Sequence, residues 1–299
     1  MRERTMVMWM RNEWQGERMA EVLSAGSGAP GVRRRILHLA ARLLPGTTGR
    51  LLAHRYLSPA SHLDPAQATR GGAELLPLAP GMAVLRHPGQ QADAPRVLLV
   101  PGHDGHVRQF ARLVRELRRL GAAVDLLILP GHLSRRRMRC GLAEIVPAIH
   151  RCGAEHGPYD AVAAHCVSAS GLLFALAEGF DCPRLAFIST PIDLPKLLRL
   201  GATQYGLSGR CRSVFEATVI RLCAPYGPEA PWREVATARH GDTLVVHARH
   251  DFAVPVEDAR ALAEAMPSAR LEIVEQGDHN GLLNIAPAMQ ALARFLAAR

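Results

Sequence analysis

Short apolar runs alternate with amphipathic segments from residue 73 to the end of the chain, and this rhythm constrains the fold more than any other feature. Turn-forming residues bound each apolar run, as they bound buried strands, and the amphipathic segments have the 3.6-residue period of helices. The pattern predicts an α/β fold with a mostly parallel, twisted sheet of about eight strands flanked by helices. The expected strands lie at 73–78, 82–87, 96–100, 123–129, 159–165, 184–190, 243–249 and 270–276. Helices are expected at 107–121, 142–157 (broken near Pro147), 167–179, 256–266 and 285–298.

Changes in composition divide the chain into four parts. Residues 1–32 are charged and Met-rich and end in small, turn-forming residues, which predicts a flexible N-terminal segment. Residues 33–72 form a helical lead-in that starts with an amphipathic helix, which we expect to pack on the domain rather than on a membrane surface. Residues 73–190 and 240–299 make the α/β core, and residues 191–239, where the strand rhythm is lost, are predicted to form a helical lid.

Composition also excludes several classes of protein. Hydrophobic residues make up 48% and charged residues 21% of the 299, which excludes a mostly disordered chain. No apolar run reaches the roughly 18 residues of a membrane span. The net charge of +9 suits an acidic partner, but the arginine runs are not interleaved with aromatic side chains, so we expect no nucleic acid. The six cysteines form no zinc-binding or disulfide pattern, which fits a reducing, cytoplasmic location. We also expect no cofactor and no metal.

The sharpest chemical signal is the sequence AHCVSAS, where a predicted strand meets a predicted helix. A nucleophile elbow has this layout, because its strained turn requires small residues two positions before and two positions after the reactive side chain. Ala164 and Ser168 meet this requirement around Cys166, which is therefore the candidate nucleophile. Two alternatives stay open. Cys166 is a small core residue, or Ser168 or Ser170 attacks instead, although both serines fall inside the predicted helix.

Two further candidates follow later strands of the predicted sheet. Asp251 comes directly after the seventh expected strand, and His279 lies in the glycine-bounded loop after the eighth. A strand–turn–helix hydrolase has its catalytic residues in the chain order nucleophile, acid and histidine, each just beyond the carboxyl end of a strand. Asp193, which follows the sixth strand, is the alternative acid.

With these residues in place, residues 73–298 resemble an α/β-hydrolase-fold enzyme, in a variant with a cysteine nucleophile. The sequence PGHDG at 101–105 occupies the loop where this fold has HGxxG, and LPGHLSRR at 129–136 retains part of the motif that follows the next strand. The resemblance implies that Cys166 is the nucleophile, Asp251 the acid and His279 the base. Cysteine-nucleophile members of the fold include polymerising acyltransferases, carrier-linked thioesterases or cyclases, and dienelactone hydrolases.

The same resemblance implies the surroundings of the sulfur. The backbone N–H groups of Val167 and His103 would form the oxyanion hole, and Gly102, Asp104 and His106 would line the pocket. For the polar side chains of this loop, a hydrogen bond that stabilises the loop is an equally good interpretation.

The choice of cysteine favours a particular substrate class. A thioester donor exchanges with an enzyme thiolate almost isoenergetically, and the resulting acyl-cysteine reacts readily with nucleophiles other than water. We therefore expect an acyl-transferring or thioester-cleaving enzyme, capable of cyclising its acyl chain, whose small-molecule acyl substrate is carried on coenzyme A or on an acidic acyl carrier protein. Two alternatives stay open: a carboxylic ester or lactone hydrolase with cysteine in place of serine, and a hydrolase-fold binding module without catalysis.

Overall fold

A computed structural model describes residues 30–60, 62–69, 72–105, 107–133 and 138–298. Within these ranges eight strands form one sheet, in the order β1-β2-β4-β3-β5-β6-β7-β8. Strand β2 runs antiparallel to β1 and β4, and all other neighbours are parallel. The strands are β1 (Glu74–Ala79), β2 (Met82–His87), β3 (Arg96–Val100), β4 (Ala123–Ile128), β5 (Ala161–His165), β6 (Arg184–Ile188), β7 (Asp242–Ala248) and β8 (Ala269–Val274). The predicted mostly parallel sheet of about eight strands is confirmed.

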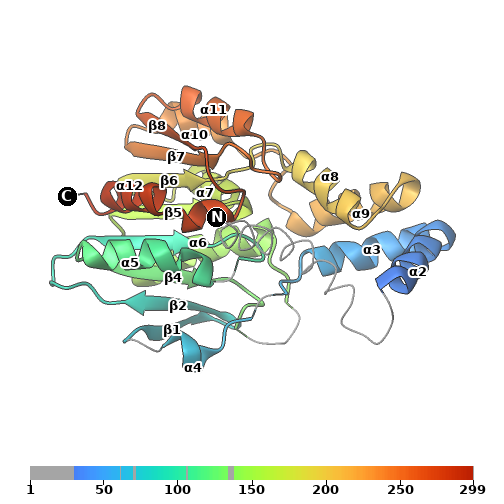
Figure 1. Cartoon of the computed structure of the whole chain (residues 1–299), viewed down its shortest axis with the longest axis horizontal. Helices are drawn as coiled ribbons and strands as arrows, with labels where there is room; N and C mark the ends of the chain where they lie inside the picture. The colour runs from blue at the N-terminus through green and yellow to red at the C-terminus, as the bar shows by residue number, and fades with distance from the viewer. Residues whose placement is uncertain (1–29, 61, 70–71, 106, 134–137, 299) are drawn as a thin grey trace, which may run out of the picture.

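Helices cover both faces of this sheet, as Figure 1 shows. Side chains of α5 and α12 share one core with the sheet, and side chains of α6, α7, α10 and α11 share the core on the other face. Successive residues of β3 alternate between the two cores, Val97 and Leu99 facing the first and Leu98 and Val100 the second, which is the two-residue period of a strand. The helices are α5 (Ala111–Arg119), α6 (Leu142–His156), α7 (Val167–Ala177), α10 (Trp232–Ala238), α11 (Val256–Ala265) and α12 (Ala286–Leu296), with 3₁₀ turns η1 (Val107–Phe110) and η2 (Gly281–Asn284).

A third core joins the N-terminal helices to the segment between β6 and β7. In Figure 1, α2 and α3 lie beside α8 and α9 at one end of the sheet. Apolar residues of α3, α8 and α9 pack together there, with Phe215 and Tyr205 at the centre. Residues 191–239 thus contain three helices, but two of them pack on the lead-in rather than standing alone. The helices are α2 (Pro30–Leu43), α3 (Pro45–Tyr56), α4 (Pro65–Ala68), α8 (Leu194–Gln204) and α9 (Gly209–Cys223).

Two local predictions differ from the structure. The helix expected to break near Pro147 is continuous as α6, because its buried apolar face outweighs the single hydrogen bond that a proline removes. The amphipathic helix of the lead-in begins at Pro30, three residues earlier than expected, and Pro45 starts a second helix directly after it. The rest of the predicted flexible segment, residues 1–29, lies outside the described residues. No helix in the described ranges is long and apolar enough to cross a membrane.

Candidate active site

Cys166 occupies the single residue between β5 and α7. Its backbone has φ 56° and ψ −136°, a conformation that costs a non-glycine residue about 1–3 kcal/mol. The surrounding structure maintains this strain: the amide of Cys166 donates to the carbonyl of Ile188 at 2.9 Å. The side chain is half-buried, and helix α7 begins immediately after it. The structure therefore contains the strained strand-to-helix turn that the sequence predicted.

The loop after β3 passes directly beside this turn. A Cβ atom added to Gly102 would lie 3.1 Å from Cβ of Cys166, so only glycine allows this approach without displacement. The hydroxyl of Ser168 donates to the carbonyl of Pro101 at 2.6 Å and holds the same loop. Ser170 is also buried and donates to the carbonyl of Pro191. Both serine hydroxyls are thus committed to backbone carbonyls inside the fold, and neither is presented as a nucleophile.

His279 joins Cys166 to Asp251. Nδ1 of His279 donates to Oδ2 of Asp251 at 2.7 Å, and the imidazole lies close enough to Cys166 for the negative charge of the sulfur to raise the pKa of the histidine. The other carboxylate oxygen, Oδ1, accepts from the amides of Ala253 at 2.8 Å and Val254 at 2.9 Å. The structure thus brings together the three side chains that the sequence singled out, and the loop amides fix the orientation of the carboxylate.

The charges of this cluster favour an imidazolium. Burial alone would lower the pKa of His279, but the negative charge of Cys166 and the hydrogen bonds to Asp251 and Cys166 outweigh it and raise the pKa to about 10. Burial would raise the pKa of Asp251, yet the hydrogen bond from His279 and its positive charge leave that pKa below its usual value. The arrangement therefore favours a protonated imidazole on His279 beside the sulfur of Cys166.

Two neighbouring histidines stay neutral and support the cluster. Nε2 of His165 donates to the backbone carbonyl of His279 at 3.1 Å, and the two rings lie 4.9 Å apart. Burial, aided by the charge of His279, lowers the pKa of His165 to about 3. Nε2 of His247 donates to the carbonyl of Val254 at 3.1 Å, and burial lowers its pKa as well. Both residues thus hold the segments that carry His279 and Asp251.

Other predicted site residues serve the loop after β3. Both ring nitrogens of His103 face backbone carbonyl oxygens, that of Tyr56 at 2.7 Å and that of Cys140. The carboxylate of Asp104 accepts from the amide of Ala60 at 2.8 Å, which is the loop-stabilising alternative. Val167 is the first residue of α7, whose first N–H groups have no partner within the helix. His106 lies outside the described residues.

The alternative acid does not approach the histidine. Asp193 is the N-cap of α8, where its carboxylate accepts from the amide of Lys196 at 3.3 Å and pairs with the Lys196 ammonium at 3.4 Å. These contacts orient it toward the start of the helix, and the hydrogen bond to Nδ1 of His279 comes from Asp251.

Sequence reasoning missed one residue close to the sulfur. Tyr56, at the end of α3, is near enough to Cys166 that, after burial, the negative charge of the sulfur is the main cause that raises its pKa. Its ring stacks on His103 and meets Phe215 edge to face. No pattern in the sequence connects Tyr56 with a residue so distant along the chain; only its place at the end of an amphipathic helix could have drawn attention to it.

The described residues hold neither a metal-binding cluster nor a disulfide. No group of three or more His, Cys, Asp or Glu side chains among them could hold a metal ion. All six cysteines are free. Burial raises the pKa of the five thiols other than Cys166, among them Cys140, Cys152 and Cys223.

Comparisons with known proteins agree with this architecture. A family model described as TAP-like protein matches residues 212–298, the part that carries Asp251 and His279. No curated protein matches the sequence.

Among solved structures, Est1E from Butyrivibrio proteoclasticus is similar at 17% identity and a TM-score of 0.57, over 77% of this chain and 100% of that one. An esterase from Pyrococcus furiosus is similar at 15% identity and a TM-score of 0.57, over 80% and 96%. The thioesterase domain from the curacin biosynthetic pathway is similar at 14% identity and a TM-score of 0.53, over 74% of this chain and 98% of that one. At these identities the similarity concerns the fold, and the chain has the α/β-hydrolase fold.

Proposed function

We propose that this chain is an enzyme that cleaves or transfers acyl groups from thioesters, through an acyl-cysteine intermediate on Cys166. The observation that carries the proposal is the set of three neighbouring side chains: a half-buried sulfur on a strained turn, an imidazole whose pKa is raised by the charge of that sulfur, and a carboxylate oxygen 2.7 Å from Nδ1 of the same imidazole. A buried structural cysteine has no need of such partners.

In the first half-reaction, the sulfur of Cys166 attacks the carbonyl carbon of the acyl thioester as an anion, with the proton on His279. The tetrahedral intermediate collapses by breaking the bond to the leaving thiol, and His279 gives its proton to that sulfur. Asp251 holds the ring so that Nδ1 carries a proton throughout and Nε2 exchanges one with the substrate.

The backbone N–H groups of Val167 and His103 would stabilise the negative oxygen of the tetrahedral intermediate. Val167 begins α7, and His103 follows Gly102, which lies against Cys166. Removal of one donor of this kind typically costs about 3–4 kcal/mol of transition-state stabilisation.

In the second half-reaction, water or another nucleophile loses its proton to His279 and attacks the acyl-cysteine, releasing the acyl group and restoring the Cys166 thiolate and the protonated imidazole. A hydroxyl of the acyl chain itself would give a cyclic product. A net charge of +9 supports a donor with negative charges, such as coenzyme A or an acidic acyl carrier protein.

Intact-protein mass spectrometry with hexanoyl-N-acetylcysteamine tests this proposal. We expect a hexanoyl adduct on the wild-type protein that is absent from Cys166→Ala. The matched control is Cys223→Ser, which removes another half-buried thiol but leaves the proposed site intact, and this variant should still be acylated.

The same experiment separates the alternatives. Faster turnover of p-nitrophenyl hexanoate than of the thioester would favour a carboxylic ester hydrolase in which cysteine replaces serine. Failure of Cys166 to react with thioester, ester or iodoacetamide would leave a binding module and refute the proposal.

A further inference from the structure

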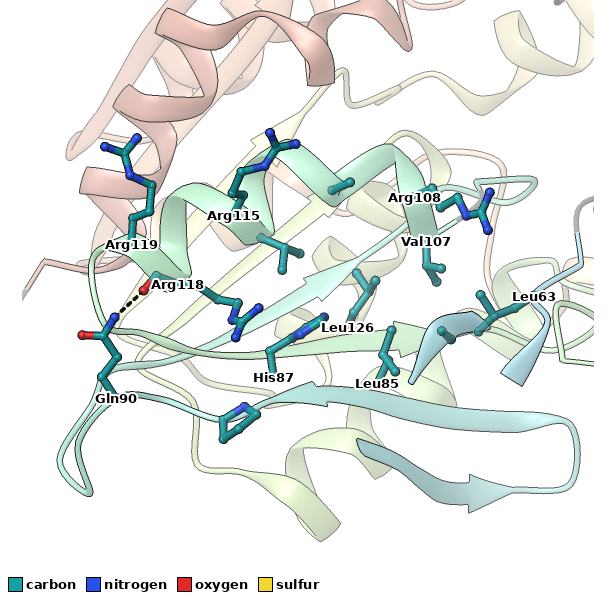
Figure 2. Close-up of a pocket in the computed structure, with 14 residues that line it drawn as sticks. Leu63, Leu85, His87, Gln90, Val107, Arg108, Arg115, Arg118, Arg119 and Leu126 are labelled. Carbon is teal, nitrogen blue, oxygen red and sulfur yellow. Dashed lines mark hydrogen bonds between the residues drawn. The ribbon is translucent and has the colours of Figure 1, made fainter. Parts of the chain in front are cut away.

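A cavity of about 590 Å³, separate from the candidate active site, lies between α5 and the strands β2 and β4. Figure 2 shows it as a groove beneath α5, with α4 and Leu63 at one end and His87 and Gln90 at the other. None of the residues that line it belongs to the turns that carry Cys166, Asp251 or His279. Its volume is in the range of pockets that bind small molecules.

The body of the groove is apolar. Leu85 of β2 and Leu126 of β4 form its floor, and Leu63 and Val107 lie toward one end. Val114 of α5 also lines it. All five side chains are buried in the fold, so the groove is a preformed feature of the core surface. An apolar chain placed along it would remove its own hydrocarbon surface from water.

The opposite end of the groove is cationic and polar. In Figure 2 the guanidinium of Arg118 extends beneath α5 toward His87. Arg118 has no carboxylate partner among the described residues, whereas its neighbour Arg119 is paired with Glu116 at 3.2 Å. Gln90 closes this end by donating to the backbone carbonyl of Arg118 at 3.1 Å. An exposed, unpaired guanidinium at the mouth of an apolar groove favours an anionic group.

The pKa of His87 is also affected by the positive charge of Arg118. Nδ1 of His87 is buried without a hydrogen-bond partner among the described residues. Burial lowers the pKa of His87, and the positive charge of Arg118 lowers it further, while Asp125 on the adjacent strand acts in the opposite direction. Asp125 is already committed to Arg86 at 2.6 Å and to the Tyr159 hydroxyl at 2.8 Å.

We propose that this groove binds an amphipathic anion, a linear apolar chain that ends in a carboxylate or a phosphate, with the anionic group at Arg118 and the chain along Leu85 and Leu126. Arg108 and Arg115 also line the cavity. The site is independent of the proposed acyl chemistry, since no residue of it takes part in that reaction.

Isothermal titration calorimetry with decanoate, decyl phosphate, decyl glucoside and inorganic phosphate tests this inference. We expect saturable binding of decanoate or decyl phosphate, with the tighter of the two identifying the head group. Decyl glucoside and inorganic phosphate should each bind at least tenfold more weakly, because each lacks one half of the ligand. Affinity should increase by about fourfold per CH₂ from hexyl to decyl chains.

Variants locate the bound ligand. Arg118→Gln should weaken binding by about tenfold, because a charge-assisted hydrogen bond is lost. Arg112→Gln removes the same charge from the same helix but does not line the cavity, so its affinity should equal that of the wild type. Binding should also raise the pKa of His87, measured from its imidazole proton resonances, because the anion offsets the charge of Arg118.

Three results would overturn the inference. Equal ligand affinity of the wild type and Arg118→Gln would exclude Arg118 as the binding site of the anionic group. Equal affinity for decanoate and decyl glucoside would exclude recognition of the anion. Loss of binding after carboxymethylation of Cys166 would place the ligand at the candidate active site instead. None of these measurements depends on turnover, so they stand apart from the test of the proposed function.

Discussion

Replacement of Asp251 by asparagine is expected to disable the histidine while leaving the fold intact. Oδ1 of Asp251 accepts from two loop amides, so the oxygen of an asparagine would stay at that position and its amide nitrogen would face His279. Nδ1 of His279 would then have to accept rather than donate, which leaves the remaining ring proton on Nε2, toward Cys166. A neutral ring in this tautomer cannot take a proton from the sulfur.

The size of the expected effect follows from burial, because the side chains of His279 and Asp251 are 7% and 0% exposed, respectively. The variant loses a charge-assisted hydrogen bond of about 1.5–3 kcal/mol and leaves an imidazolium N–H facing another donor, at about 1–3 kcal/mol. Together these costs lower the pKa of His279 by about two to four units. We expect iodoacetamide to alkylate Cys166 on the order of 100-fold more slowly at pH 7, with a rate that increases more steeply with pH.

The assay is the rate of alkylation between pH 5 and 10, with peptide mapping to identify the modified cysteine and circular dichroism to verify the fold. The matched control is Asp193→Asn, which changes the alternative acid at the N-cap of α8. An Asp251→Asn profile that superimposes on the wild type would refute the reasoning, as would an equal effect of the control.

Three further outcomes are expected. The raised pKa of His279 stabilises the fold fully below about pH 6.5 and loses this effect as the pH increases through about 10, so urea unfolding should show the wild-type advantage over His279→Gln shrinking across that interval. Gly102→Ala should lower stability by about 1–3 kcal/mol and slow alkylation of Cys166, because the new Cβ would lie 3.1 Å from the cysteine Cβ; an unchanged melting temperature would contradict this. His165→Leu should cost about 1–3 kcal/mol, since the buried carbonyl of His279 loses its donor, and thermal unfolding measures it.

The sheet and the three central residues of the candidate site could be predicted because each depends on local sequence. Apolar period and turn residues mark the strands, and parallel strands bring their carboxyl ends to one edge. Cys166, Asp251 and His279 each follow a strand end, so their proximity in the structure required no knowledge of side-chain packing.

The remaining features depend on contacts between distant segments. Tyr56 lies near Cys166 because α3 packs on α9, and no local pattern encodes that packing. The continuity of α6 through Pro147 is another example, since the local effect of one proline was outweighed by the buried face of the whole helix. The sequence left two candidates for the acid, Asp193 and Asp251. Only the structure shows that Asp193 caps α8 and that Asp251 accepts the hydrogen bond from His279.

The positive φ of Cys166 lowers the stability of the fold, but it also presents the side chain at the turn. Cys166→Gly would relieve about 1–3 kcal/mol of strain, which exceeds the roughly 0.5–1 kcal/mol of extra chain entropy that glycine brings. That variant should therefore melt at a slightly higher temperature while lacking any sulfur at the turn. A screen of variants for heat resistance alone would tend to erase the feature that presents this side chain to a substrate.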